Sequence, residues 1–224
     1  MKDYLNLPAK ELLDEYGTGS HVPGSGSAAA MGAMIGAQLA ITVCKLTCQK
    51  PRYKDKHAQV EHLQKELEII FNKLKGYFYR DIEIFSEVSK LRIQRDQTLI
   101  FEEKDKFQRA QLEQLKLASD IPLFIADEAF RLAEIGIILF DSGFKSARGD
   151  SGVAIANGIG AATGALFVIL LNLKSFQESE WKDQMYITCN PRFLKLQTLQ
   201  LEAMKRTALL KDEGDLNGQL EIAF

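Results

Sequence analysis

Apolar residues recur every three or four positions in the second quarter of the chain. They form one stripe: Val60, Leu63, Leu67, Ile70, Leu74 and Tyr77, continuing through Ile84 or Phe85 to Val88. This period is typical of a long amphipathic α-helix that buries one face. We therefore predict a helix that begins near Lys54 and passes Val88.

Proline, glycine and serine indicate where the helices of the first quarter begin and end. Pro8 can begin a short helix that ends at Gly17. Ser27 can cap a helix that runs to about Cys48, and Pro51 prevents that helix from continuing. Stretches with the alternating pattern of a β-strand are nearly absent. The pattern therefore predicts helices here as well.

The middle of the chain continues in the same way. Residues 92–115 open as a polar connection and close as another amphipathic stretch. Pro122 begins a further apolar helix that reaches about Phe140. Residues 141–150 have the composition of a loop.

The last part of the chain predicts two more helices. Asp150 can cap the helix of residues 151–173, and Pro191 begins the last long helix. No linker, repeat or low-complexity stretch divides the sequence. We therefore predict one all-α domain, a single-domain helical bundle over residues 1–224.

Two long runs, residues 23–43 and 151–173, contain no charged side chain. Each is long enough to span a bilayer, for which about 20 apolar residues suffice. In each run small residues stand four apart: Gly32, Gly36 and Ala40 in the first, Gly152, Ala156, Gly160 and Gly164 in the second. Both runs also contain polar residues, and neither is flanked by a Trp/Tyr belt or a basic cluster. We interpret them as two packed central helices and expect no membrane span.

The composition and charge of the chain argue against several classes of protein. The chain is 46% hydrophobic and 26% charged, and its formal net charge of -2 gives no general attraction to nucleic acid or anionic lipid. The N-terminal segment lacks an apolar signal core, and three cysteines cannot all pair within one chain, so we expect a cytoplasmic protein. Cys44 and Cys48 with His21, His57 and His62 lack the spacing of metal ligands. We expect no metal.

Asp81 is the residue that departs most from the helical pattern. Four residues after Tyr77, it occupies a position on the stripe where an apolar side chain is expected. Burial raises the pKa of a carboxyl group toward the range that is useful for proton transfer. The pattern therefore indicates either a general acid/base or a structural ion pair with a basic neighbour such as Arg80.

The sequence PGSGS precedes the first uncharged helix. Gly24 and Gly26 allow a ligand to approach the main chain closely, and with Ser25 and Ser27 they precede free N–H groups that favour an anion. The segment is not a nucleotide P-loop, because the Gly-Lys-Ser/Thr ending is missing. A flexible turn with Ser27 as an ordinary cap is the alternative.

Other polar residues allow two interpretations each. Asp150 can cap its helix or line a cleft, and Asn172 can close a polar gap or contact a ligand. The basic residues Lys45, Lys50 and Arg52 follow the first uncharged helix. They can attract an acidic tail of a ligand or form a solvated surface.

These segments, in this order, resemble the cyclodeaminase/cyclohydrolase family over nearly the whole chain. PGSGSAAAMGAMIGAQLA resembles the family's Pro-Gly-Gly-Gly-Ser turn and its small-residue helix, and KLTCQKPRY resembles the segment that follows. DIEIF matches Asp-x-x-x-Phe. DIPLFIADEAFRLAEIG, GDSGVAIA and GALFVILLNLKSF match the later helices.

The resemblance implies an all-α bundle, usually a homodimer, that binds a reduced folate in a cleft and needs no other cofactor. The reactions occur at the one-carbon unit that joins N5 and N10 of tetrahydrofolate, either by cyclodeamination or by hydrolysis of the methenyl compound. The resemblance implies Asp81 as the acid/base. It implies substrate contacts for these residues: Gly24, Ser25, Gly26, Ser27, Asp150, Asn172, Lys45, Lys50 and Arg52.

The chain also departs from the family pattern. Tyr79 stands where a second Asp is usual, Ser25 replaces the middle glycine of the turn, and Phe144 replaces an Asn. Gly149 replaces a Ser, and Val168 replaces an Asn. Two hypotheses follow: a folate enzyme with a modified site, or a non-catalytic relative that binds a folate-like ligand or a protein partner.

Overall fold

The computed structural model describes residues 2–221, and within this part of the chain it contains helices and no strand. Six α-helices follow one another: α1 (Ala9–Tyr16), α2 (Ser25–Cys48), α3 (His57–Gln97), α4 (Phe101–Ser142), α5 (Arg148–Leu173) and α6 (Glu180–Glu221). Three short 3₁₀ helices accompany them: Tyr4–Asn6 precedes α1, Pro51–Lys56 joins α2 to α3, and Lys145–Ala147 joins α4 to α5. The prediction of an all-α fold is confirmed.

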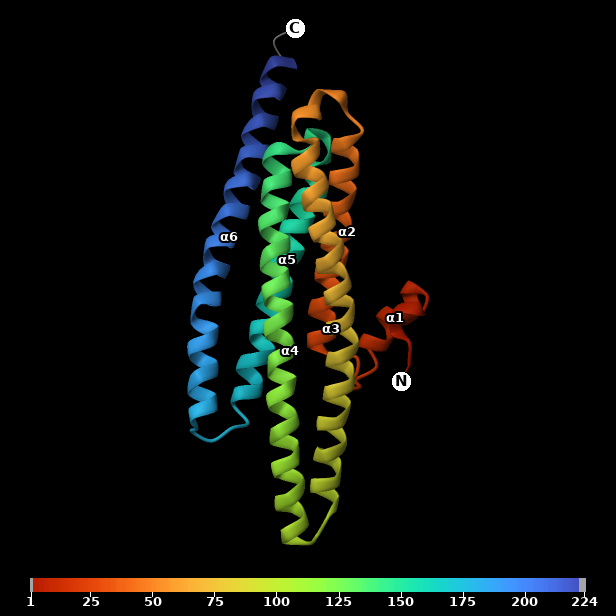
Figure 1. Cartoon of the computed structure of the whole chain (residues 1–224), viewed down its shortest axis with the longest axis vertical. Helices are drawn as coiled ribbons and strands as arrows, with labels where there is room; N and C mark the ends of the chain where they lie inside the picture. Colours follow the sequence, from red (N-terminus) through yellow and green to blue (C-terminus); the bar gives the residue numbers. More distant parts are fainter. Residues whose placement is uncertain (1, 222–224) are drawn as a thin grey trace.

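Helices α2 to α5 form an up-and-down bundle, in which each packs against its neighbours in sequence and α2 closes the ring against α5 (Figure 1). Helix α6 lies along the outside of α4 and α5, and α1 stands to the side of the bundle. The antiparallel pair α3 and α4 extends beyond the other helices. The start of α2 and the end of α5 therefore lie beside the middle of α3.

The stripe predicted for α3 is buried. Leu67 and Leu74 are fully inaccessible to solvent, and Val88 closes the same row. Phe78, rather than its neighbour Tyr77, is the fully buried aromatic residue of this stripe. The interpretation of the two uncharged runs as central helices also agrees with the bundle, because α2 and α5 each contribute many buried alanines.

The small residues of these two helices differ in how closely their surroundings pack against them. A Cβ atom on Gly36 of α2 would lie 2.9 Å from the Cβ of Asn157, so this glycine is required for close packing of α2 against α5. A Cβ atom on Gly160 of α5 would meet nothing within 4 Å. The expectation that Gly160 also lies in a packed contact is wrong for the single chain.

The prediction that Pro122 begins a helix is wrong, because this residue lies inside α4. A proline cannot donate to the carbonyl group four residues earlier, which here belongs to Ala118. The Asn172 amide of α5 donates to this carbonyl instead, at 3.2 Å. The prediction failed because a side chain that is distant in sequence, on the neighbouring helix α5, pairs with the carbonyl group that the proline leaves free. Pro191 likewise lies inside α6.

Two predicted helix starts are also corrected. Helix α2 begins at Ser25, with Gly24 as its N-cap, so Ser27 belongs to the first turn. Helix α5 begins at Arg148, and Asp150 lies in its first turn rather than at the cap position. An acidic residue in a first turn still favours the helix, because it faces the positive end of the dipole.

Helix α2 and the segment Lys145–Leu173 are long and apolar enough to cross a membrane, judged by length and composition only. In the bundle, 56% of the most apolar window of α2 and 44% of that of the second segment are buried. About half of each apolar window is therefore buried in the core of the bundle.

Candidate functional site

The glycine turn and the first turn of α2 form a small hydrogen-bonded unit. The Gly24 N–H donates to Ser27 Oγ at 3.1 Å, and Ser27 Oγ donates to the Gly24 carbonyl at 2.8 Å. The Ser27 side chain is fully buried. Ser27 thus fixes the turn that precedes the helix.

Asp81 of α3 completes this unit from the neighbouring helix. Its Oδ2 atom accepts the Ser27 N–H at 2.7 Å, so the carboxylate satisfies one of the free N–H groups at the start of α2. A Cβ atom on Gly26 would overlap the Asp81 carboxylate. Gly26 is therefore required because the carboxylate occupies the space of a side chain.

The surroundings of Asp81 raise its pKa toward neutral pH. The residue is only 8% exposed, and within the described residues no lysine or arginine forms an ion pair with it. Burial raises the pKa of Asp81 to about 6, while the Ser27 N–H acts in the opposite direction. Such a carboxyl group can both accept and donate a proton at neutral pH.

Asp81 lies at the wall of a cleft of about 290 Å³. The lining comes from the loop before α2 and from all four bundle helices: Ser20, His21, Gly24, Ser25, Gly26, Asp81, Phe85, Ala118, Val168 and Leu171. The structure thus brings the glycine turn and Asp81 together in one cleft.

Sequence reasoning considered His21 only as a metal ligand and so missed its place in this cleft. The only signal was its position three residues before Gly24. A second missed neighbour is Tyr16, whose hydroxyl is buried without a hydrogen-bond partner in the described chain. Burial raises the pKa of Tyr16, its interaction with the Ser27 side chain lowers it, and the charge of Asp81 raises it further.

The basic residues predicted for a ligand tail lie elsewhere. Ser27 and Lys45 stand at opposite ends of α2, about 27 Å apart at a rise of 1.5 Å per residue. Lys50 and Arg52 lie over the ring of Phe144, with the cations 5.2 and 5.4 Å from its centroid. In one chain, these residues do not border the cleft that contains Asp81.

Asp150 and Asn172 are also outside the lining of this cleft. Asp150 lies in the first turn of α5, at the end of that helix opposite to the cleft residue Leu171. Asn172 is buried and donates to the carbonyl of Ala118, whose residue does line the cleft. Asn172 therefore supports the cleft wall rather than facing the open space.

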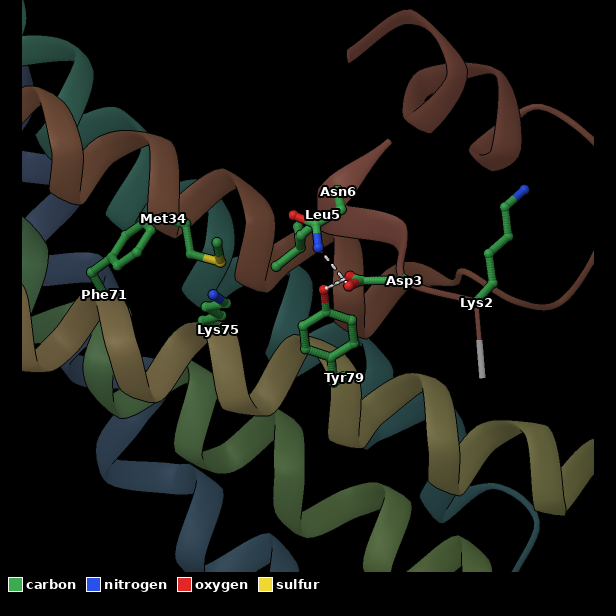
Figure 2. A pocket seen from close by; sticks show the side chains of 8 residues that line it. All are labelled: Lys2, Asp3, Leu5, Asn6, Met34, Phe71, Lys75 and Tyr79. Carbon is green, nitrogen blue, oxygen red and sulfur yellow. Dashed lines mark hydrogen bonds between the residues drawn. The ribbon is translucent and has the colours of Figure 1, made fainter. Parts of the chain in front are cut away.

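Of the positions that depart from the pattern that the resemblance implies, Ser25 and Val168 line the cleft and Tyr79 does not. Tyr79 borders a separate pocket of about 620 Å³ between α2, α3 and the N-terminal segment. Figure 2 shows its ring directed toward Asp3, to which the hydroxyl donates a hydrogen bond. Asn6 donates to the same carboxylate at 2.6 Å, and these bonds lower the pKa of Asp3. Tyr79 thus binds the N-terminal segment to α3.

Among the residues that the structure describes, no three His, Cys, Asp or Glu side chains gather closely enough to hold a metal ion.

Comparisons with known proteins agree with this architecture. A methenyltetrahydrofolate cyclohydrolase of Methylorubrum extorquens is 25% identical over 80% of this chain and 85% of its own length. The formimidoyltransferase-cyclodeaminase of Sus scrofa is 28% identical over 93% of this chain, which spans 37% of that longer protein.

The fold is shared with a solved structure. The crystal structure of formiminotetrahydrofolate cyclodeaminase from Thermotoga maritima superposes with a TM-score of 0.77, at 20% identity, over 90% of this chain and 96% of the other. The profile of the formiminotransferase-cyclodeaminase family matches residues 8–190. Because this match covers most of the sequence, the chain belongs to the formiminotransferase-cyclodeaminase family.

Proposed function

We propose that this protein is a folate one-carbon enzyme of the cyclodeaminase or methenyltetrahydrofolate cyclohydrolase type, with a modified active site. The observation that carries the proposal is Asp81, a carboxyl group buried at the wall of a cleft and held against the glycine turn. A reduced folate binds in this cleft, with its one-carbon unit beside Asp81. The relatives act on folate derivatives, which supports this ligand class.

Both reactions require proton transfer at one carbon atom. In cyclodeamination, N10 attacks the N5-formimino carbon and ammonia leaves. In hydrolysis, water adds to the methenyl carbon and the ring opens to the 10-formyl compound. A carboxyl group with a pKa of about 6 can carry a proton in either direction.

Turnover of methenyl- and formiminotetrahydrofolate by purified protein tests the proposal and separates the two activities. We expect one substrate to be consumed, and Asp81→Asn to lower kcat by about 10²-fold or more, because an amide cannot carry the proton. Asp120→Asn is the matched control, since burial also raises the pKa of Asp120 but this residue does not line the cleft. Full turnover by Asp81→Asn would remove Asp81 from the mechanism.

A non-catalytic relative that binds a folate-like ligand or a protein partner is the second candidate function. Val168 favours it, because an apolar side chain lines the cleft where the family resemblance implies an amide. Folate binding without turnover of either substrate would support this alternative.

We further propose that two copies of the chain associate through the outer side of α5. Three apolar side chains of this helix are exposed: Val153 by 47%, Phe167 by 68% and Leu171 by 66%. A Cβ atom added to Gly160 would meet nothing within 4 Å, so the surface is open there as well. Small residues between larger apolar ones permit close approach of a second helix. Light scattering should show a dimer that Phe167→Glu dissociates, while Leu99→Glu, at the tip of the α3–α4 pair, leaves it intact. A monomeric wild type would contradict this proposal.

We also propose that the protein works in the cytoplasm without a membrane. Its three cysteines are free, and Cys44 and Cys189 are buried. Burial raises the pKa of Cys44 to about 12, so this thiol is unreactive. Recovery of the protein only in the membrane fraction would contradict the proposal.

A further inference from the structure

The cleft contains one titratable side chain besides Asp81. Among the described residues that line it, His21 is the only other residue with an acidic or basic side chain. The other lining side chains are apolar or bear neutral hydroxyl groups. The proton chemistry of this cleft can therefore involve two residues.

The loop that carries His21 is ordered by local hydrogen bonds. Thr18 Oγ1 donates to the Glu15 carbonyl at 2.9 Å and accepts the Ser20 N–H at 3.3 Å. Ser20 Oγ accepts the Val22 N–H at 3.2 Å. These bonds fix the backbone on both sides of His21.

The imidazole of His21 lies edge-on to Phe85, with ring centroids 6.5 Å apart and planes at 64°. Phe85 follows Asp81 by one helical turn, so His21 and Asp81 border the same stretch of α3. The His21 side chain is exposed, whereas Asp81 is buried. The His21 imidazole makes no hydrogen bond with the described residues, so both of its ring nitrogens are free to bind a ligand or water.

We propose that His21 is a second catalytic residue of this cleft and exchanges protons with the water or ammonia that enters or leaves, while Asp81 serves the folate nitrogens. This inference rests on the proposed function. The division of roles follows from exposure: a group at the mouth of the cleft contacts solvent, and a buried group contacts the bound ring system.

The protons balance in both reactions. In hydrolysis, the water oxygen bonds to the methenyl carbon, and one of its protons passes to His21 and then to solvent. The second proton passes through Asp81 to N5 as the bond from carbon to N5 breaks. In cyclodeamination, the N10 proton passes through Asp81 to the departing nitrogen. The protonated His21 supplies the additional proton that makes the leaving group ammonia.

Chemical rescue tests this role. We expect His21→Ala to lower kcat by about 10²-fold or more on the substrate that the wild type turns over, with a smaller change in KM. Added imidazole should restore part of kcat, because the exposed site leaves room for the free base. Asp81→Asn should not respond to imidazole. His62→Ala is the matched control, since His62 is exposed on α3 and outside the cleft.

The outcomes separate the two proposals. An active wild type whose His21→Ala variant keeps its kcat, or loses activity that imidazole does not restore, would overturn the role of His21 alone. A wild type that turns over neither substrate would overturn the proposed function and this inference with it. Circular dichroism of His21→Ala should match that of the wild type, which excludes loss of fold as the cause.

Discussion

Replacement of Asp81 by asparagine should make the folded protein more stable at neutral pH. The carboxyl group is buried without a cationic partner in the described chain, so its ionisation in the folded state is costly. An asparagine side chain has nearly the same shape, and its amide oxygen can still accept the Ser27 N–H. The substitution therefore removes the charge and keeps the packing.

The pKa gives the size and the pH window of this effect. Burial raises the pKa of Asp81 from 3.8 to about 6. The folded protein therefore binds a proton more tightly than the unfolded chain, and the free energy of unfolding decreases as pH rises from about 4 to about 6. One pKa unit corresponds to about 1.4 kcal/mol, so the full cost above pH 7 is about 3 kcal/mol. Asparagine has no such cost.

Urea denaturation of both proteins at pH 4 and pH 7.5 measures this difference. We expect nearly equal free energies of unfolding at pH 4 and an advantage of up to about 3 kcal/mol for Asp81→Asn at pH 7.5. In thermal unfolding, this corresponds to an increase in Tm of about 6–12 °C for a chain of this size. Because each variant is compared with the wild type at the same pH, the titration of all other groups cancels.

The pH dependence decides the result. An advantage of the same size at both pH values would show that the carboxylate is not destabilised by burial. Loss of stability at pH 7.5 would show that the ionised group makes a favourable interaction that the structure does not contain. Asp14→Asn on α1 is the control, because Asp14 is exposed and its replacement should give no such gain.

Four further substitutions test the packing of the bundle. Gly36→Ala should destabilise by about 1–3 kcal/mol through overpacking, whereas Gly76→Ala on α3, where an added Cβ atom would meet nothing within 4 Å, should be neutral or stabilising by up to about 1 kcal/mol; equal melting of the two variants would contradict this. Gly26→Ala should also destabilise and weaken folate binding, because its methyl group displaces the buried carboxylate, and unchanged binding in titration calorimetry would argue otherwise. Asn172→Leu should cost about 1–3 kcal/mol in denaturant unfolding by leaving the Ala118 carbonyl unpaired. A loss below 0.5 kcal/mol, on the order of a surface substitution, would count against that bond.

Much of the fold could be predicted because it follows from local periodicity. The stripe from Val60 to Val88 specified α3 and the burial of Asp81, since a helix places residues three and four apart on one face. The role of Pro122 could not be predicted from local periodicity. Whether a proline ends a helix depends on whether another group pairs with the carbonyl that it leaves free, and Asn172 is 54 residues away in sequence from this carbonyl of Ala118.

The site was predictable only in part. The glycine turn and Asp81 were each visible because each breaks a local rule, a helix start with two glycines and a charge on an apolar stripe. His21 breaks no rule and could be placed only by the fold. Lys50 and Arg52 follow α2 in sequence, but a straight helix carries them away from the turn at its start.

The turn and the carboxylate depend on each other, which explains how the chain can change family positions and keep its fold. Asp81 holds the start of α2 through the Ser27 N–H, and Gly26 leaves the space that the carboxylate fills. This contact stabilises the bundle whether or not a ligand is bound. Val168 lines the same cleft, and its apolar side chain offers no hydrogen bond there. If Val168 replaces an amide, as the family resemblance implies, the cleft loses a hydrogen-bonding group at this position and keeps the buried carboxyl group of Asp81.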